Sequence, residues 1–427
     1  MEAAADSVAS DGIGCTSQLE HALHSGLMQM GLELMTALLT SDLALEDNYE
    51  KSAGERNGGR HAKTVTTVFG DVRIPARTYY HKTSSGHFPW DDRMGLCGSY
   101  TPAVIADALR LASIHNYEEA AQEFARSHAF PISPDAIRDI VIANATKARL
   151  FLDLDASTAD TRRADRAYIL GDGTGISMFG KYLEGVKGKD GGRAKTREVK
   201  LGAIFTGSVK KGEPHRDEDS TTYVATTMRW REFGAGLRKE FDRRFPMKPA
   251  QTIFLTDGGK WLRSIRDNFF PFATMVLDLF HALDHLKGIL ALLGFKEGSD
   301  EFKAQFGKWR RSIKAGRIKS VVRKIEELET EKNRAELEKK LQYYRDNFDR
   351  MNYGEYSEKF WFVGSGVVES GCKCVVQQRM DNSGMHWSID GAEALLMIRA
   401  MYKSGRLDEY TNWLVKDLDQ VVFRAVA

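Results

Sequence analysis

The chain contains 427 residues, and its 61 basic and 59 acidic side chains give a formal net charge of +2. With 42% hydrophobic and 28% charged residues, the composition is that of an ordinary globular protein, which excludes a disordered chain, a collagen-like chain and a disulfide framework. At roughly 150 residues per domain, this length favours two or three domains.

The cysteine content and the N-terminus bear on the compartment. Four cysteines are too few for a disulfide framework, so we expect a reducing cytosol. The first residues lack the basic start and apolar stretch of a signal peptide, and no later apolar run is long enough to span a bilayer. We therefore expect neither a secreted nor a membrane protein.

The first part of the chain is predicted to combine helices with one hairpin. Residues 17–40 carry leucine and methionine at mostly helical spacing with few charges, which predicts one amphipathic helix. Residues 64–80 alternate β-branched and polar side chains around a Gly70-Asp71 turn, the pattern of a β-hairpin. Two further helices are predicted at 102–113 and 117–127.

A third helix is predicted to start sharply at Pro134, because Ser133 is a good N-cap and proline suits the first turn. A helix, a short turn and a capped helix outline a helix-turn-helix, in which Arg138 is a candidate DNA contact. Plain packing of three helices produces the same pattern, so both alternatives stay open.

From residue 166 the pattern changes to alternating strands and helices. A helix is predicted at 230–245, and strands are predicted at 167–170, 199–205, 223–227, 252–255 and 274–277. Three early strands followed by alternating helix and strand predict a mixed α/β sheet with helices on both faces. We expect the first of these strands to end in a glycine-rich turn at 171–175.

The stretch from 298 to 359 is long, charged and helical in pattern. Its centre holds a basic run with no acidic residue, whose members are candidate DNA contacts: Arg310, Arg311, Lys314, Arg317, Lys319, Arg323 and Lys324. Such runs bind phosphates without sequence preference, although a solvated helix face has the same composition.

Three acidic residues have the context of a metal site. Asp172 and Asp257 each follow an apolar strand and precede glycines, and Glu369 opens a predicted helix after Gly364-Ser365-Gly366. Ligands of α/β sheets bind at the carboxyl ends of strands, and carboxylate oxygens suit Mg²⁺. Two such ions about 4 Å apart can activate an attacking oxygen and stabilise a leaving one during phosphoryl transfer.

These motifs together resemble the bacterial insertion-sequence transposases of the DDE type, in the group related to Mutator-like elements and Kra-type insertion sequences. The matching segments are Gly-Asp-Gly-Thr at Asp172, Thr-Asp-Gly-Gly at Asp257 and Gly-Val-Val-Glu-Ser-Gly at Glu369. Asp278-Leu-Phe-His281 is similar to the group's Cys/Asp-x-x-His motif, and the resemblance covers roughly residues 60 to 405.

The resemblance implies an RNase H-like core and metal-dependent cleavage and strand transfer of an insertion sequence. Asp172, Asp257 and Glu369 would hold two Mg²⁺ or Mn²⁺ ions, with Asp278 and His281 beside them as further catalytic residues. It also implies double-stranded DNA as partner, both terminal inverted repeats and target, a dimer or larger assembly on that DNA, and a bacterial cytoplasm near the nucleoid. A metal-dependent RNase H-like nuclease and a catalytically silent DNA-binding descendant remain alternatives.

The acids are separated by 257 − 172 = 85 and 369 − 257 = 112 residues, and the larger gap indicates a helical insertion. We expect an N-terminal helical segment (1–60), a hairpin region (61–100), a helical DNA-binding region (101–160), a catalytic core (161–297 and 360–405), a helical insertion (298–359) and a C-terminal helical tail (406–427). Two more DNA contacts are considered: Lys373, and Trp387, for which core packing is the alternative. Because no close cysteine pair follows the hairpin, we expect no zinc there.

Overall fold

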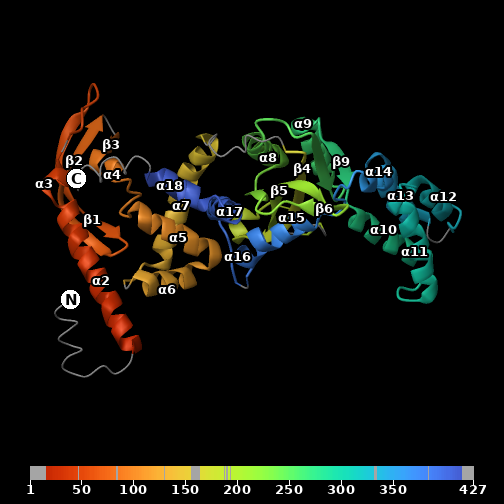
Figure 1. Ribbon diagram of the computed structural model, residues 1–427, viewed down its shortest axis with the longest axis horizontal. Coiled ribbons are helices and arrows are strands. Elements are labelled where there is room, and N and C mark those ends of the chain that lie inside the picture. The colour runs from red at the N-terminus through yellow and green to blue at the C-terminus, as the bar shows by residue number, and fades with distance from the viewer. Residues whose placement is uncertain are drawn as a thin grey trace. The chain divides into compact units, whose positions relative to one another are not determined.

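The computed structural model describes residues 16–46, 48–82, 85–128, 130–154, 164–186, 188, 191–192, 194–330, 334–382 and 384–415. The chain divides into two compact units (Figure 1): unit 1 comprises Met1–Leu154 and Arg406–Ala427, and unit 2 comprises Asp155–Gly405. Across the described ranges, every helix is too short or too polar to cross a membrane.

Unit 1 combines a three-stranded antiparallel sheet, in the order β1-β2-β3, with helices. Its elements are α2 (Thr16–Leu39), α3 (Asp42–Leu45), β1 (Arg56–Thr67), β2 (Gly70–Lys82), β3 (Ser85–His87), α4 (Pro89–Arg93), α5 (Pro102–Ile114), α6 (Tyr117–His128), α7 (Pro134–Leu154) and α18 (Leu407–Val415).

The predicted hairpin is confirmed, with its turn one step earlier than expected. Thr67 pairs with Gly70, so residues 68–69 make the turn and Gly70, at φ +127°, already belongs to β2. One face of the hairpin buries Val65, Val72 and Ile74, against which the leucines and methionine of α2 pack. This apolar face explains why the alternating pattern of β1 and β2 forms a sheet.

Helices α5, α6 and α7 form as predicted, and α7 begins at the expected cap. The Ser133 hydroxyl accepts a hydrogen bond from the Ala136 amide at 3.1 Å, and Pro134 opens the helix. Helix α18, from the far end of the chain, joins them: the Tyr410 hydroxyl donates to Oδ1 of the buried Asn144 at 3.0 Å. No local pattern predicts that contact.

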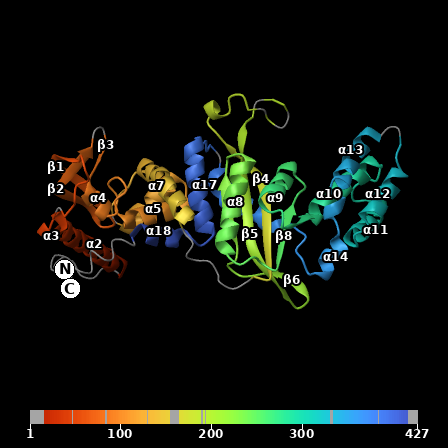
Figure 2. The ribbon, with the colours of Figure 1, turned by 90° about the horizontal axis from the view of Figure 1, so that it is seen from above.

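Unit 2 is a mixed sheet with helices on both faces (Figure 2). Its strands are β4 (Arg166–Ser177), β5 (Thr196–Lys210), β6 (Glu213–Arg216), β7 (Thr222–Thr226), β8 (Gln251–Thr256) and β9 (Thr274–Leu277). The order is β6-β5-β4-β8-β9, and β7 also pairs with β5. Pairs among β4, β5, β6 and β7 are antiparallel, whereas β8 is parallel to both β4 and β9.

The helices of unit 2 follow the alternation of the strands. Those that cover the sheet are α8 (Trp230–Arg244), α9 (Lys260–Phe269), α15 (Gly366–Gly371), a π-helical turn (Cys372–Gln377), α16 (Gln378–Met380) and α17 (Ile389–Lys403). Ile169 and Phe254 face α8 and α9 in a core that also holds Phe233, Leu237 and Leu262. The opposite face of β4 and β5 lies against α15 and the π-helical turn.

The expected glycine-rich turn at 171–175 is wrong. β4 continues to Ser177, because β5 pairs with it residue by residue from Ala167 to Ser177. Close packing favours glycine at 171, where a Cβ would lie 2.5 Å from the fully buried Leu262. Asp172 is therefore inside a long strand, two residues beyond the end of its pairing with β8.

The predicted helical stretch after β9 forms a set of short helices. Within 298–359 they are α11 (Asp300–Lys314), α12 (Ile318–Glu326), α13 (Arg334–Arg345) and α14 (Tyr353–Glu358), and α10 (Leu279–Leu292) precedes them directly after β9. Trp309, Ile313, Val321, Ile325, Leu337 and Leu341 are buried among them. The apolar residues of this charged stretch thus form a small core of their own.

Candidate functional site

Two aspartates extend the same pair of neighbouring parallel strands. The ladder between β4 and β8 ends at Leu170 and Leu255, which pair with each other. Asp172 and Asp257 each lie two residues farther on, so they share the register and the face of those leucines. Side chains alternate along a strand, and this face is the one opposite α8 and α9.

A third aspartate occupies the same level on the next strand. Thr256 of β8 pairs with Leu277 of β9, so Asp257 and Asp278 follow side by side. Asp172, Asp257 and Asp278 therefore form a row of three carboxylates just beyond the last paired residues of the two parallel ladders, while β4 itself continues to Ser177. Neighbouring strands lie about 4.8 Å apart, which keeps the charges of such a row close together.

Glu369 approaches this row from α15. The helix comes close to the sheet at Gly371, where a Cβ would lie 2.8 Å from Tyr223 and 2.9 Å from Leu201. The Ser365 hydroxyl donates to Glu369 Oε1 at 2.6 Å. The Glu369 side chain is exposed.

The environment of Asp172 disfavours its charge. The carboxylate is half-buried and accepts hydrogen bonds from the Gly173 amide at 2.7 Å and the Cys372 thiol at 3.6 Å. Burial raises the pKa of Asp172, and the negative charges of Asp257 and Glu369 raise it further against the lowering effect of the two donors. Burial and the neighbouring carboxylates therefore both favour the protonated form of Asp172.

Asp278 is fully buried and connects α10 to the loop before α15. One oxygen accepts from the His281 amide at 2.8 Å and caps α10, and the other accepts from the Ser365 amide. Burial raises the pKa of Asp278, but the hydrogen bonds from His281 and Ser365 outweigh it and hold the pKa below its ordinary value.

His281 carries a positive charge at neutral pH. Its ion pair with Asp278, in which Nδ1 and Oδ1 are 3.8 Å apart, raises the pKa of His281 to about 9 despite partial burial, and the charges of Asp257 and Glu369 add to the effect. The donor atoms of Asp278, His281 and Glu369 all lie within 4.8 Å of one another, a group that does not include Asp172 or Asp257. A protonated imidazole offers no lone pair, so this group is an ion-pair cluster at neutral pH.

The π-helical turn that follows Glu369 is held by hydrogen bonds from Arg399. The π-helical turn at Cys372–Gln377 presents the carbonyl oxygens of Cys374 and Val375 to the buried guanidinium of Arg399 on α17, which donates to both. Burial lowers the pKa of Arg399 to about 10. Single π turns are frequent at functional sites, and here Arg399 pairs carbonyls that an α-helix would satisfy itself.

The helices between Glu297 and Tyr353 contact the carboxylate row through α13. The Tyr343 hydroxyl donates to the Asp257 carbonyl at 2.9 Å, and its ring stacks on His285 at 3.7 Å. Gly258, at φ +98°, leaves room for that ring, since a Cβ there would lie 3.0 Å from it. Burial raises the pKa of Tyr343, with further contributions from Asp257 and Asp278, so it stays a neutral donor.

The predicted basic run forms an exposed surface on α11 and α12. Its seven members are exposed and form no ion pair with any described residue: Arg310, Arg311, Lys314, Arg317, Lys319, Arg323 and Lys324. Lys319 lies over the ring of Phe348 at 5.9 Å. Uncompensated charge on two neighbouring helices is what a phosphate-binding surface requires.

The other candidate DNA contacts differ in availability. Arg138 is half-exposed, but its guanidinium pairs with Asp135 at 2.6 Å and Asp139 at 3.0 Å. Lys373 is exposed on the π-helical turn. Trp387 is only 7% exposed and donates to the Met380 carbonyl at 2.9 Å, so its ring is not available to stack on a base, and the core-packing alternative is correct.

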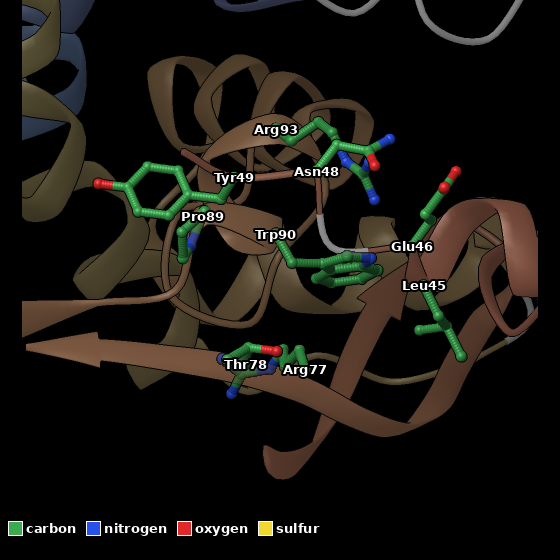
Figure 3. A pocket seen from close by; sticks show the side chains of 9 residues that line it. All are labelled: Leu45, Glu46, Asn48, Tyr49, Arg77, Thr78, Pro89, Trp90 and Arg93. Carbon is green, nitrogen blue, oxygen red and sulfur yellow. The ribbon is translucent and has the colours of Figure 1, made fainter. Parts of the chain in front are cut away.

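A cavity of about 200 Å³ lies in unit 1 (Figure 3). It is lined by Leu45, Glu46, Asn48, Tyr49, Arg77, Thr78, Pro89, Trp90 and Arg93. Its cationic groups are already engaged: Arg77 pairs with Asp91 at 3.2 Å, and Arg93 and the Trp90 indole both donate to the Ala44 carbonyl. The cavity is therefore a gap within the packing of α3, α4 and β2, and it holds none of the sequence-predicted site residues.

Three residues near the carboxylates were missed by sequence reasoning. Ser365 binds both Asp278 and Glu369, Cys372 binds Asp172, and Tyr343 binds the backbone of Asp257. Ser365 and Cys372 lie immediately before and after the Gly-Val-Val-Glu-Ser-Gly segment of Glu369, and this proximity is a signal that could have identified them. Tyr343 lies 86 residues from its partner and had none.

Comparisons with known proteins complete the description. A search of proteins of curated function found no match. One similar solved structure is a Drosophila P element transposase strand transfer complex, at 10% identity and a TM-score of 0.27, over 78% of this chain and 86% of that one. A TM-score this low does not establish a shared fold. The model of the uncharacterised protein family UPF0236 matches residues 11–417. The chain therefore belongs to the UPF0236 family.

Proposed function

We propose that the protein is a DDE-type transposase, with unit 2 as an RNase H-like core that cuts DNA at the ends of an insertion sequence and joins them to a target. The carrying observation is the row of Asp172, Asp257 and Asp278 in register on one face, with Glu369 brought to it by α15. The mixed sheet, with four strands paired antiparallel (β4 to β7) before the parallel β8 and β9, supports the RNase H-like assignment.

The donor set fits divalent cations such as Mg²⁺ or Mn²⁺. Asp172, Asp257 and Glu369 supply hard oxygen ligands. Burial is the main cause that raises the pKa of Asp172, and the negative charges of Asp257 and Glu369 add to it; a bound cation would offset both effects. Bound there, two such ions would polarise a phosphodiester and favour the ionised form of the attacking hydroxyl.

The chain's own groups would prepare this chemistry. Asp278 orients His281, whose positive charge offsets the carboxylates that would otherwise repel a phosphate. Ser365 orients Glu369, and Cys372 orients Asp172. Tyr343 fixes the backbone of Asp257 and so links the helical insertion to the site.

The substrate would be double-stranded DNA, held by the basic surface of α11 and α12. The seven exposed cations of this surface would neutralise phosphates and give affinity that falls with salt. Lys373, next to the carboxylates, would contact phosphate close to the cut. Two DNA ends would require at least two copies of the chain on one DNA.

The test is a cleavage and strand-transfer assay on DNA carrying the sequences that flank the gene, with Mg²⁺ or Mn²⁺. We expect the unmodified protein to cut and join the ends, and Asp172→Asn and Glu369→Gln to bind the same DNA without cutting it. Asp267→Asn, an exposed and ion-paired aspartate of α9, is the matched control and should remain active.

The outcomes separate the alternatives. Cleavage without joining would favour a metal-dependent nuclease. Binding without cleavage by the unmodified protein would favour a silent descendant. Cleavage that survives Asp172→Asn or Glu369→Gln would overturn the carboxylate assignment itself.

A further inference from the structure

The N-terminal helix α2 exposes a continuous apolar stripe. Leu23, Leu27, Met30, Leu34 and Leu38 are 50%, 59%, 46%, 58% and 53% exposed, although they are large and apolar. Single exposed leucines are ordinary on a protein surface, whereas a contiguous row of them marks an interaction site. We refer to these five residues as the α2 stripe.

The first four residues of the α2 stripe have the alternating spacing of a coiled-coil seam, and Leu38 continues the same face one residue beyond the next seam position. The intervals are 27 − 23 = 4, 30 − 27 = 3, 34 − 30 = 4 and 38 − 34 = 4 residues. At about 100° per residue, the five side chains fall within an arc of about 80°, the narrow band that coiled coils use rather than the wider face of a helix buried in a globular core. Its geometry therefore fits another helix.

The opposite side of α2 is already used. Leu32, Met35 and Leu39 pack against the core of the β1-β2 hairpin. The helix is thus held in one rotational setting by its own unit. The α2 stripe faces away from that packing, on the remaining side of the helix.

The charge of α2 selects the class of partner. The helix has two acidic residues, Glu20 and Glu33, and neither lysine nor arginine. Helices that bind DNA or lie on a membrane surface carry basic residues, so α2 suits neither partner. The five residues of the α2 stripe are uncharged, so two copies of the stripe can pack together without opposing like charges.

We propose that the α2 stripe pairs with the α2 stripe of a second copy of this chain, in antiparallel orientation. Such a contact is self-complementary about a two-fold axis. In a parallel pair the two Glu20 side chains, three residues before Leu23, would meet in the seam. In the antiparallel pair Leu23 faces Leu34 of the second copy and Leu27 faces Met30, which keeps the glutamates apart.

The buried area sets the strength of the pair. A fully buried leucine or methionine removes roughly 60–120 Å² of apolar surface. Five half-exposed side chains from each copy then remove roughly 300–600 Å², below the roughly 1,200 Å² of a stable interface. The α2 contact alone should therefore give a weak dimer that dissociates on dilution.

The first experiment is sedimentation of the full chain between about 1 and 100 µM. We expect monomer at the low end and dimer at the high end, and monomer throughout for the double variant Leu27→Glu, Leu34→Glu. The matched control adds the same charge to the exposed side of α2 outside the stripe, with Gln18→Glu and Ser25→Glu, and should dimerise like the unmodified protein. Circular dichroism verifies that each variant is folded.

The second experiment is disulfide cross-linking in a Cys15→Ser background. Leu23→Cys and Leu34→Cys should cross-link when the two proteins are mixed and not when either is alone, because like positions are about 16 Å apart in the antiparallel pair. A monomer at all concentrations, a dimer that survives both glutamates, or cross-linking of Leu23→Cys alone would overturn the proposal. The proposal would also be overturned if the protein dimerised only after residues 416–427 were removed, because the α2 stripe would then bind that segment rather than a second copy. None of these outcomes depends on catalysis.

Discussion

Asp278→Asn is the perturbation whose effect on the carboxylate site can be worked out most fully. Both oxygens of this buried side chain accept backbone hydrogen bonds, from His281 and from Ser365. Asparagine keeps one acceptor and turns its amide hydrogens toward the other donor. The loss of a charge-assisted hydrogen bond costs about 1.5–3 kcal/mol, and a buried unpaired donor about 1–3 kcal/mol. We expect a total destabilisation of about 3–5 kcal/mol.

The same substitution should release the proton of His281. Its pKa of about 9 depends first on the ion pair with Asp278, so in Asp278→Asn it should fall toward the ordinary value near 6.5. His281 is 45% exposed, so solvent screening reduces this ion pair's share of the stability to about 1 kcal/mol. Because the pKa of His281 is raised in the folded state, its ion pair contributes its full stability below the unfolded pKa of about 6.5. This contribution is lost as the pH rises through the folded pKa of about 9. The stability gap between the two proteins should therefore narrow from pH 6.5 to 9.

Two measurements test this reasoning. Urea unfolding of unit 2, followed by tryptophan fluorescence, gives the change in stability at each pH, and a histidine NMR titration gives the pKa of His281. Asp284→Asn is the control, because Asp284 is an exposed partner of Lys287 on the same helix and should change stability by less than about 0.5 kcal/mol. A loss below 1 kcal/mol in Asp278→Asn, or a His281 pKa that stays near 9, would refute the assigned hydrogen bonds.

Three further predictions concern the support of the site and its DNA surface. Gly258→Ala should destabilise unit 2 by about 1–3 kcal/mol in thermal unfolding, because the new Cβ would sit at a backbone φ of +98° and also contact Tyr343. Gly298→Ala is the control: Gly298 has a φ of +87° but no neighbour within 4 Å of a Cβ, so only the backbone strain remains and the loss should be smaller. Arg399→Met should cost about 2–5 kcal/mol in urea unfolding by leaving the carbonyls of the π-helical turn unpaired, and a loss under 1 kcal/mol would show that the turn does not need it. Arg311→Ala should lower the slope of log binding constant against log salt by about 0.9, while Arg138→Ala, already paired with two aspartates, should leave the slope unchanged; equal effects in a DNA-binding titration would contradict the assignment of the DNA surface.

Much of unit 2 could be predicted because its information is local. Runs such as Thr252–Leu255 and Thr274–Leu277 are apolar over the length of a buried strand, and the structure has strands there. The acidic residues that follow them were visible for the same reason. Ser133 and Pro134 likewise identified the start of α7, since capping depends on neighbouring residues alone.

What the sequence by itself determined is therefore the type and position of most elements and the candidate carboxylates. Only the tertiary structure decided how far β4 extends, because its glycines are held in the strand by β5 rather than by their own propensity. It also decided the register that aligns Asp172, Asp257 and Asp278, and the contact of Tyr343 with Asp257 across 86 residues. Strand register and side-chain packing depend on residues distant in the chain, and no local pattern encodes which of them meet.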